Sequence, residues 1–214
     1  MVRDYAKSQH FVVDIDLVRR SGKPYLDSLS SNTRYQIRKA LKGAAKLGGL
    51  HLEVARSAGE GGEFFAELVR LHQQYWREKS HPGAFADPFV TDFHARFLGS
   101  DAALGEVQLL RMSAGSTVLG YLYNLVVGDR VYSYQSGFDY RHADLKPGII
   151  SHVMAIDHYL AGSVETYDLL EGESQYKRSL SHLSFPMYWL AVNPGLLRFR
   201  LESFLRNRLA KQKD

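Results

Sequence analysis

The chain has 214 residues, of which 45% are hydrophobic and 23% charged, and its formal net charge is +4. This composition is ordinary for a globular protein, and the length suits one large domain or two small ones. The chain contains no cysteine, which excludes disulfides, thiolate metal sites and cysteine nucleophiles. No apolar run reaches the ~18 residues of a membrane span, and no secretory signal precedes the first strand. A cytoplasmic location is therefore expected.

The first half of the chain shows patterns of strands and amphipathic helices. Strands are predicted at residues 10–16 and 50–55. Between them, a helix capped within residues 30–33 ends at Gly48, and its basic residues Arg34 and Arg38 begin a stripe with no acidic neighbour. A turn at 59–62 precedes a helix from Phe64 to about Lys79. A further helix begins at Asp87 and Pro88, with Val90, Phe93 and Phe97 facing inward.

The second half begins with strands at 106–111, 118–127 and 131–138, and the last two are joined by the hairpin turn Gly128-Asp129. A helix from Pro147 to Leu160 leads to a strand at 165–170, and strand, helix, strand at this spacing predicts a parallel pair. A short helix at 174–181 and a strand at 185–192 follow. Pro186 places that last strand at an edge of the sheet.

The turn Lys146-Pro147-Gly148 stands before the helix of the parallel unit. Proline suits the first helical turn, and glycine leaves the backbone open to a ligand. The N–H groups of Gly148, Ile149 and Ile150 would be free at the positive end of the helix, where a phosphate could bind. A helix start with nothing bound is the alternative.

The order of predicted elements and three short sequence motifs resemble the GNAT acyltransferase superfamily, in its CelD-like branch, which is related to the Fem aminoacyl transferases. The motifs are LSSNTR at 29–34, YQSGFD at 134–139 with the turn that follows it, and YDLLEGE at 167–173 followed by Tyr176-Lys177. The resemblance implies an α/β (α+β) fold, a GNAT-like mixed sheet with helices on both faces and extra N-terminal and C-terminal helices. The GNAT-like domain would cover 29–192. Residues 1–28 would be a remnant of a preceding half-domain, and 193–214 a basic amphipathic helix.

The resemblance also implies a chemistry: an acyl group moves from acyl-CoA, for example acetyl-CoA, to a small-molecule or peptide amine by direct attack. Tyr176 would protonate the thiolate leaving group and Lys177 would stabilise the oxyanion. Glu171 and Glu173 are candidate bases at the C-terminal end of a parallel strand, and Asp139 flanks the same opening from the neighbouring strand as a further catalytic candidate. A tyrosine packed in the core, a surface pair of Glu173 with Lys177, and a turn cap at Asp139 are the structural alternatives.

Binding residues follow from the same comparison. The pyrophosphate of the donor would lie at Lys146, Pro147, Gly148, Ile149 and Ile150, with Arg141 as counter-charge. The substrate would contact Tyr134, Arg34 and Arg38. The usual turn pattern Q/R-x-x-G-x-G/A is reduced at 144–149 to a single glycine. No metal site is expected, because HExxH is absent and the spacing of His152 and His158 does not put both on one helix face.

Two other functions remain open. A Fem-like transferase would take an amino acid from aminoacyl-tRNA, and the basic stripe that begins at Arg34 and Arg38 would contact the phosphates. A non-catalytic GNAT-fold module would bind a partner or a membrane surface through the basic residues of 196–213. A homodimer packed through that last helix is a further expectation.

Overall fold

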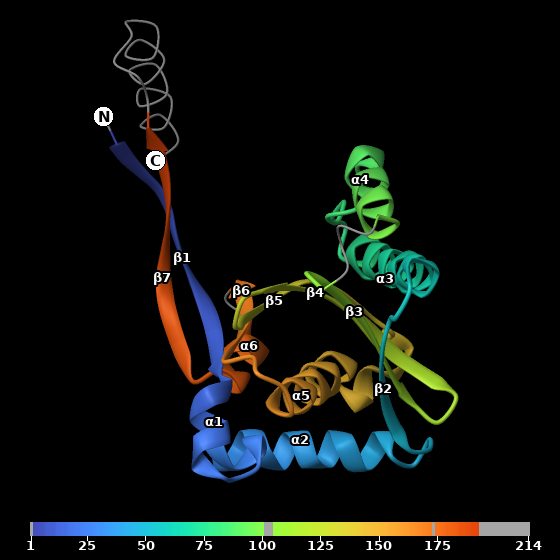
Figure 1. Ribbon diagram of the computed structural model, residues 1–214, viewed down its shortest axis with the longest axis vertical. Helices are drawn as coiled ribbons and strands as arrows, with labels where there is room; N and C mark the ends of the chain where they lie inside the picture. Colours follow the sequence, from blue (N-terminus) through green and yellow to red (C-terminus); the bar gives the residue numbers. More distant parts are fainter. Residues whose placement is uncertain (1, 101–104, 173, 193–214) are drawn as a thin grey trace, which may run out of the picture.

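The computed structural model describes residues 2–100, 105–172 and 174–192. In this part of the chain, strands form one mixed sheet in the order β2-β3-β4-β5-β6-β1-β7 (Figure 1). The strands are β1 (Val2–Asp14), β2 (Leu50–Val54), β3 (Val107–Ala114), β4 (Thr117–Val127), β5 (Arg130–Phe138), β6 (Thr166–Glu171) and β7 (Leu183–Val192). Neighbouring strands are antiparallel except β5 and β6, whose predicted parallel pairing is confirmed.

Helices cover both faces of the sheet, as predicted. The α-helices are α1 (Ile15–Ser21), α2 (Ser31–Ala44), α3 (Ala58–Glu78), α4 (Pro88–Leu98), α5 (Pro147–Leu160) and α6 (Gln175–Leu180). The 3-10 helices are η1 (Tyr25–Ser28) and η3 (Tyr140–Leu145). Helices α3 and α4 lie over one face, and α5 lies on the other with α2 beneath it (Figure 1). None of these helices has the length and apolarity needed to cross a bilayer. The predicted C-terminal helix at 193–214 falls outside the described residues.

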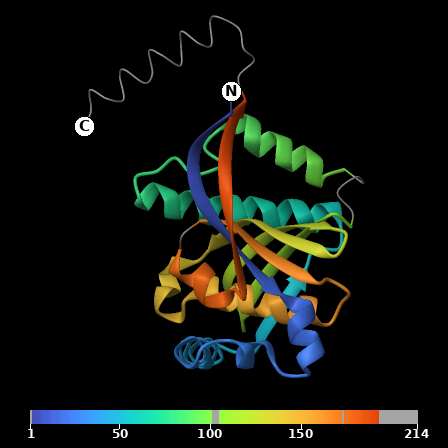
Figure 2. The same cartoon turned by 90° about the vertical axis from the view of Figure 1, so that its left-hand side faces the viewer.

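The N-terminal strand differs from its prediction. It was expected at 10–16, but β1 covers Val2–Asp14 and α1 begins at Ile15. The side chain of Asp14 accepts a hydrogen bond from Leu17 N at 2.8 Å, so it caps the helix that replaces the last expected strand residues. Residues 10–14 pair with β6, whereas 2–9 pair with β7 alone. This two-stranded arm extends beyond the rest of the sheet (Figures 1 and 2).

Helix α3 also begins earlier than expected, because the predicted turn at 59–62 is helical. Ser57 Oγ accepts a hydrogen bond from Glu60 N at 3.2 Å, and the Glu60 carboxylate accepts one from Arg56 N at 2.7 Å. Ser57 thus satisfies one of the N–H groups that a helix start leaves free, and Glu60 fixes the backbone just before the helix. This capping outweighs the low helix propensity of the glycines in that first turn.

Helix α4 is rotated relative to its predicted orientation. Phe93 was expected to face inward but is 54% exposed, and the buried positions are His94 and Leu98. Strand β3 is longer than predicted, because its pairing with β2 continues to Ala114. Pro186 lies on β7, which forms an edge of the sheet as expected.

Two apolar layers flank the sheet. One, packed against α5 and α1, includes Phe11, Leu122 and Ile156, and the other, packed against α3, includes Phe65 and Leu68. Helix α3 lies directly on β5 at Gly137, where a Cβ atom would collide with the carbonyl oxygen of Leu68. This close approach places the C-terminal half of α3 beside the end of β5.

Candidate active site

Strands β5 and β6 run parallel at first and then separate. Residues 130–132 pair with 166–168, and beyond this point β5 pairs only with β4 and β6 only with β1. The register between β4 and β5 shifts here and leaves Tyr134 without an opposite residue. Such a bulge bends its strand, which accounts for the separation. The opening lies at the carboxyl ends of two parallel strands, where ligand sites of α/β sheets are usually found.

Aromatic side chains from five elements, α3, β5, η3, α5 and α6, meet at this opening. Tyr140 of η3 packs on Tyr75 of α3, with ring centroids 4.7 Å apart. Tyr176 of α6 stacks on His152 of α5 at 5.6 Å, and Phe138 makes edge contacts with both Tyr140 and His152. Burial raises the pKa of the Tyr176 hydroxyl, so this group carries its proton at neutral pH and can donate it.

His152 lies beneath Tyr176 and is 2% exposed. Its Nδ1 shares a hydrogen bond of 2.9 Å with the hydroxyl of Tyr167, while its buried Nε2 has no partner among the described residues. Burial, with a smaller effect of the nearby Lys177 charge, lowers the pKa of His152 to about 3. The imidazole is therefore neutral, and only one of its nitrogens is satisfied.

Lys177 follows Tyr176 and points back to the end of β6. Its Nζ donates a hydrogen bond to the carbonyl oxygen of Glu171 at 2.6 Å. Burial lowers the pKa of Lys177, although Asp168 and Glu171 oppose this effect. A half-buried cation thus lies at the mouth of the opening, beside the exposed Glu171.

Asp168 is a buried acid in this region, 2% exposed. It accepts hydrogen bonds from His10 Nδ1 at 3.2 Å and from Leu170 N at 2.8 Å. Leu170 has a φ of 60°, a left-handed conformation that is strained for a leucine. The Asp168 carboxylate holds this strained backbone, and it aims the chain that follows toward α6.

The turn Lys146-Pro147-Gly148 begins α5 as predicted, but it offers fewer free amides than expected. The N–H groups of Ile149 and Ile150 both donate to the carbonyl oxygen of Lys146, at 3.0 and 3.2 Å. Among the predicted amides, that of Gly148 alone has no partner in the described structure. Pro147 is buried, and the Nζ of Lys146 donates to Gln36 Oε1 at 2.8 Å. A phosphate would find one amide and one lysine here.

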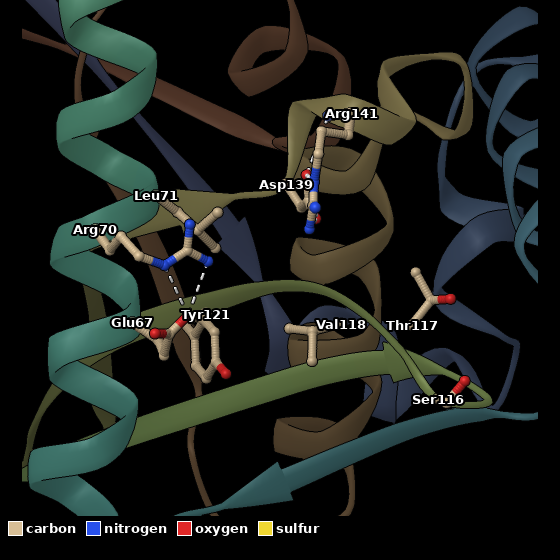
Figure 3. Close-up of a pocket in the computed structure, with 9 residues that line it drawn as sticks. All are labelled: Glu67, Arg70, Leu71, Ser116, Thr117, Val118, Tyr121, Asp139 and Arg141. Atoms are coloured by element: carbon tan, nitrogen blue, oxygen red, sulfur yellow. Dashed lines mark hydrogen bonds and ion pairs between the residues drawn. The ribbon is translucent and has the colours of Figure 1, made fainter.

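Asp139 and Arg141 lie on the other side of η3, at a pocket (Figure 3). Asp139 is 5% exposed, and its side chain caps η3 by accepting a hydrogen bond from Arg141 N at 3.0 Å. Asp139 therefore forms the turn cap that was the structural alternative to a catalytic role. It also accepts from Arg141 Nε, and this guanidinium lowers the pKa of the carboxyl. Asp139 is thus held as a carboxylate with its lone pairs occupied, which does not suit a general base.

The predicted substrate residues lie apart from one another. Tyr134 points into the layer under α4, where its hydroxyl lies 3.2 Å from His94 Nε2. Arg34 donates to the carbonyl oxygen of Leu29 at 2.8 Å, and Arg38 forms an ion pair with Asp27 at 3.2 Å. Both arginines therefore make contacts at the start of α2. Within the described residues, no group of three or more His, Asp or Glu side chains is arranged to hold a metal ion.

The family model of the acetyltransferase (GNAT) domain matches residues 31–178, more than half of the chain. The chain belongs to the GNAT acetyltransferase domain family. The expected GNAT resemblance is thus confirmed, and with it an acyltransferase domain. No curated protein matches the chain in sequence.

Solved structures with a similar fold include FemX, at 11% identity and a TM-score of 0.59 over 83% of this chain and 59% of that one. The C-terminal domain of a putative lysylphosphatidylglycerol synthetase from Agrobacterium fabrum matches at 15% identity and a TM-score of 0.59, over 91% and 62%. L-PGS from Bacillus licheniformis matches at 10% and 0.56, over 99% and 68%. This GNAT chain thus spans about three fifths of the first two structures. At these identities the likeness shows the fold, and the CelD-like branch stays a prediction.

In this GNAT domain, the fold brings together Tyr176, Lys177 and Glu171 at the opening between β5 and β6. Glu173 lies outside the described residues. Sequence reasoning missed the support from His10 and Asp168. Asp168 lies between the buried residues Tyr167 and Leu169, but its partner His10 is 158 positions away, so no local signal in the sequence could have linked the two.

Proposed function

We propose that this GNAT domain transfers an acyl group from acyl-CoA to an amine by direct attack, at the opening between β5 and β6. The observation that carries the proposal is the placement of Tyr176 and Lys177 at this opening. A protonated phenol and a half-buried cation lie in consecutive positions. These are the two groups that a thioester needs when its sulfur leaves and its oxygen gains charge.

The proposed step balances in protons and bonds. The amine nitrogen attacks the thioester carbonyl, a C–N bond forms and the C–S bond breaks. The Glu171 carboxylate takes the proton that the amine loses, and the hydroxyl of Tyr176 protonates the departing thiolate. Exchange with water then restores both residues. The Lys177 ammonium stabilises the oxyanion between these events. Glu171 fits the role of base better than Asp139, which is bound by Arg141.

The donor would enter along the free edge of β5. Beyond residue 132 this edge pairs with no strand of the described residues, so an extended, amide-containing arm can add to it as a strand would. The donor phosphates would then lie near Lys146 and the free amide of Gly148.

Titration calorimetry with acetyl-CoA and palmitoyl-CoA tests the donor. Binding in the micromolar to millimolar range is expected, and it should weaken in a Lys146→Gln variant. Lys42→Gln on the exposed face of α2 is the matched control. Absence of binding to either compound at millimolar concentration would contradict an acyl-CoA donor.

A second candidate is a Fem-like transfer from aminoacyl-tRNA. It is favoured by the single free amide at the start of α5, which is a poor cradle for a pyrophosphate, and by the fold likeness to FemX. The exposed Lys42 and Lys46 continue the basic stripe that begins at Arg34 and Arg38. They form no ion pair within the described residues and could contact phosphates. Filter binding of a tRNA mixture over a range of salt concentrations tests this. Reversal of both lysines to glutamate should weaken a salt-dependent binding, and binding that ignores salt contradicts the candidate.

A further inference from the structure

A pocket of about 340 Å³ lies between α3, the start of β4 and η3 (Figure 3). Its two sides carry the same arrangement of charges. Glu67 and Arg70 form a pair on α3, and Asp139 and Arg141 form a pair opposite them. The remaining lining residues are Leu71, Ser116, Thr117, Val118 and Tyr121. The pocket is therefore polar at its rim and has hydroxyls at the turn between β3 and β4.

The two arginines are held in the same way. In each, Nε and Nη2 donate to a carboxylate: those of Arg70 to Glu67 at 3.0 and 2.8 Å, and those of Arg141 to Asp139. Among the described residues, Nη1 of neither arginine has a hydrogen-bond partner. The outer edge of each guanidinium is thus free. Such an edge fits the two oxygens of a carboxylate or phosphate.

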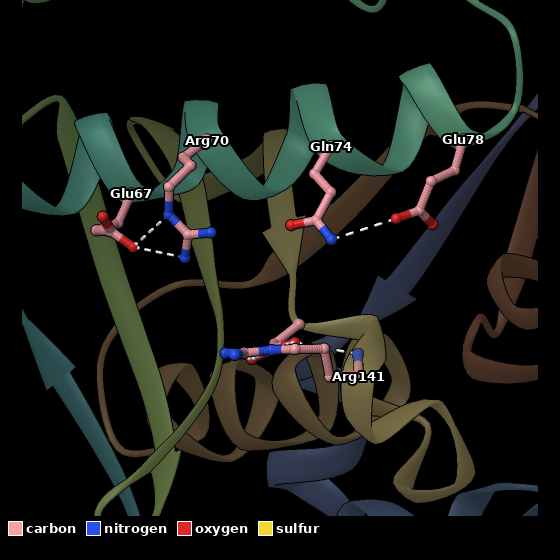
Figure 4. Close-up of polar contacts among 6 residues, drawn as sticks. Glu67, Arg70, Gln74, Glu78 and Arg141 are labelled. Carbon is pink, nitrogen blue, oxygen red and sulfur yellow. Dashed lines mark hydrogen bonds and ion pairs between the residues drawn. The ribbon is translucent and has the colours of Figure 1, made fainter.

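The carboxylates fix the direction of these edges. Glu67 and Arg70 lie one helical turn apart, and Figure 4 shows them at one end of a polar ridge of α3 that continues through Gln74 and Glu78 and faces Arg141. Asp139 is buried, and the Arg141 guanidinium lowers its pKa, so its charge persists well into the acid range. A guanidinium held by a buried carboxylate loses less freedom when it binds an anion.

The pocket and the turn at Lys146 lie on different faces of the sheet. Phe138 packs in the layer against α5, and its ring lies against Gly148. The next residue, Asp139, lines the pocket beside α3. Tyr140 then joins the two regions, since it packs on Tyr75 and against Phe138, whose ring contacts the His152 on which Tyr176 stacks. The pocket is therefore adjacent to the proposed reaction centre, and it is separate from the proposed donor phosphate site.

We infer that Arg70 and Arg141 bind the acidic group of the acceptor, so that the acceptor is an amine that carries a carboxylate or a phosphate. The assignment of the bound molecule as the acceptor rests on the proposed acyl transfer. The binding of an anion by the two arginines does not depend on that proposal. The acidic group lies between the free guanidinium edges, and its amine extends past Tyr140 toward Tyr176.

Anion binding is measured first, without any donor. Sodium phosphate and sodium acetate are titrated into the full chain, and backbone amide shifts are followed by NMR. We expect saturable shifts at residues of α3 and η3 in the millimolar range, with affinity lower by about tenfold in Arg70→Gln, as expected when a charge-assisted hydrogen bond is lost. Arg77→Gln is the matched control, since Arg77 is exposed on α3 and does not line the pocket. The stronger of the two anions identifies the acidic group.

Arg141→Lys provides a second variant, because it keeps the charge beside Asp139 and removes the planar fork. It should bind the anions more weakly while its thermal unfolding stays close to that of the wild type. Shifts that are equal in wild type, Arg70→Gln and Arg141→Lys would overturn the inference. So would the absence of any saturable shift, even if acyl transfer were observed.

Two further measurements distinguish whether the anion bound in the pocket belongs to the acceptor or to the coenzyme A donor. Coenzyme A binding should be unchanged in Arg70→Gln, and an equal loss for coenzyme A would assign the pocket to the donor and overturn the inference. With acetyl-CoA, phosphoethanolamine and glycine should be better acceptors than ethanolamine, by at least about tenfold in kcat/KM. Equal rates for all three would also overturn it. If none of them reacts, the acyl transfer fails, and the anion titration still decides the pocket.

Discussion

The ring of Tyr176 lies nearly flat on that of His152, with centroids 5.6 Å apart and an angle of 17° between the planes. The stack joins α6, which follows β6, to α5, which precedes it. His152 is held in turn by Tyr167 of β6. The phenol proposed as proton donor is therefore positioned by a neutral imidazole whose own orientation is set by the strand.

Removal of the Tyr176 hydroxyl should affect the reaction far more than the fold. In Tyr176→Phe the ring still stacks on His152, so urea unfolding should change by less than about 1 kcal/mol. Without the proton donor, kcat for acyl transfer should fall about 100-fold, the lower range for general acid catalysis. Tyr35→Phe is the control, because Tyr35 is 63% exposed on α2. An unchanged kcat would show that Tyr176 only packs the opening.

Burial of His152 should make the protein less stable in mild acid. Its pKa is about 3 in the folded chain, against 6.5 for an unperturbed histidine, so between these values the unfolded chain binds a proton that the folded chain does not. The free energy of unfolding therefore falls as pH falls below about 6.5, by about 2 kcal/mol from this residue at pH 5.

This contribution is measured by urea unfolding at pH 7 and pH 5. The loss between the two values should be smaller in His152→Asn than in the wild type. His51→Asn, at an exposed position on β2, should lose as much as the wild type. Equal losses in all three proteins would contradict a neutral, buried His152.

Lys177 should act on the transition state more than on binding. In Lys177→Met the side chain keeps its apolar stem but loses the ammonium that lies at Glu171, so kcat should fall about 100-fold with little change in KM for the donor. Lys39→Met on the exposed face of α2 is the control. If KM rises and kcat stays the same, Lys177 binds the donor and does not stabilise the oxyanion.

The contact between α3 and β5 should tolerate no side chain at Gly137. A methyl group there would meet the backbone of Leu68, so Gly137→Ala should destabilise the protein by about 2 kcal/mol or more, as overpacking does. Gly62 lies on α3 and has open space around it, so Gly62→Ala should stabilise the helix by about 0.5 kcal/mol. Thermal unfolding of both variants checks this. A neutral Gly137→Ala would mean that α3 can move away from the sheet.

The order of elements and their parallel pair could be predicted from sequence, because apolar periodicity and turn residues are local signals. Strand β4 and helix α5 follow that pattern almost residue by residue. The predicted boundaries of α1 and α3 are wrong where side chains cap the start of a helix. Ser57 with Glu60 extends α3 backward over glycines, and Asp14 begins α1 inside the expected strand. These caps are visible in the sequence, but they compete with glycine and strand signals of similar strength.

The GNAT family, the proton donor Tyr176 and the cation Lys177 could be proposed from the sequence by itself, since they lie in short ordered phrases. The tertiary structure alone decided how these residues are supported and what faces them. The stack of His152 on Tyr176, the contact of His10 with Asp168 and the opposed pair of Arg70 and Arg141 all join distant segments. It also decided that Ile149 and Ile150 use their amides within α5. Such relations depend on the bend of β5 and on the approach of α3 to the sheet, and neither leaves a periodic pattern in the chain.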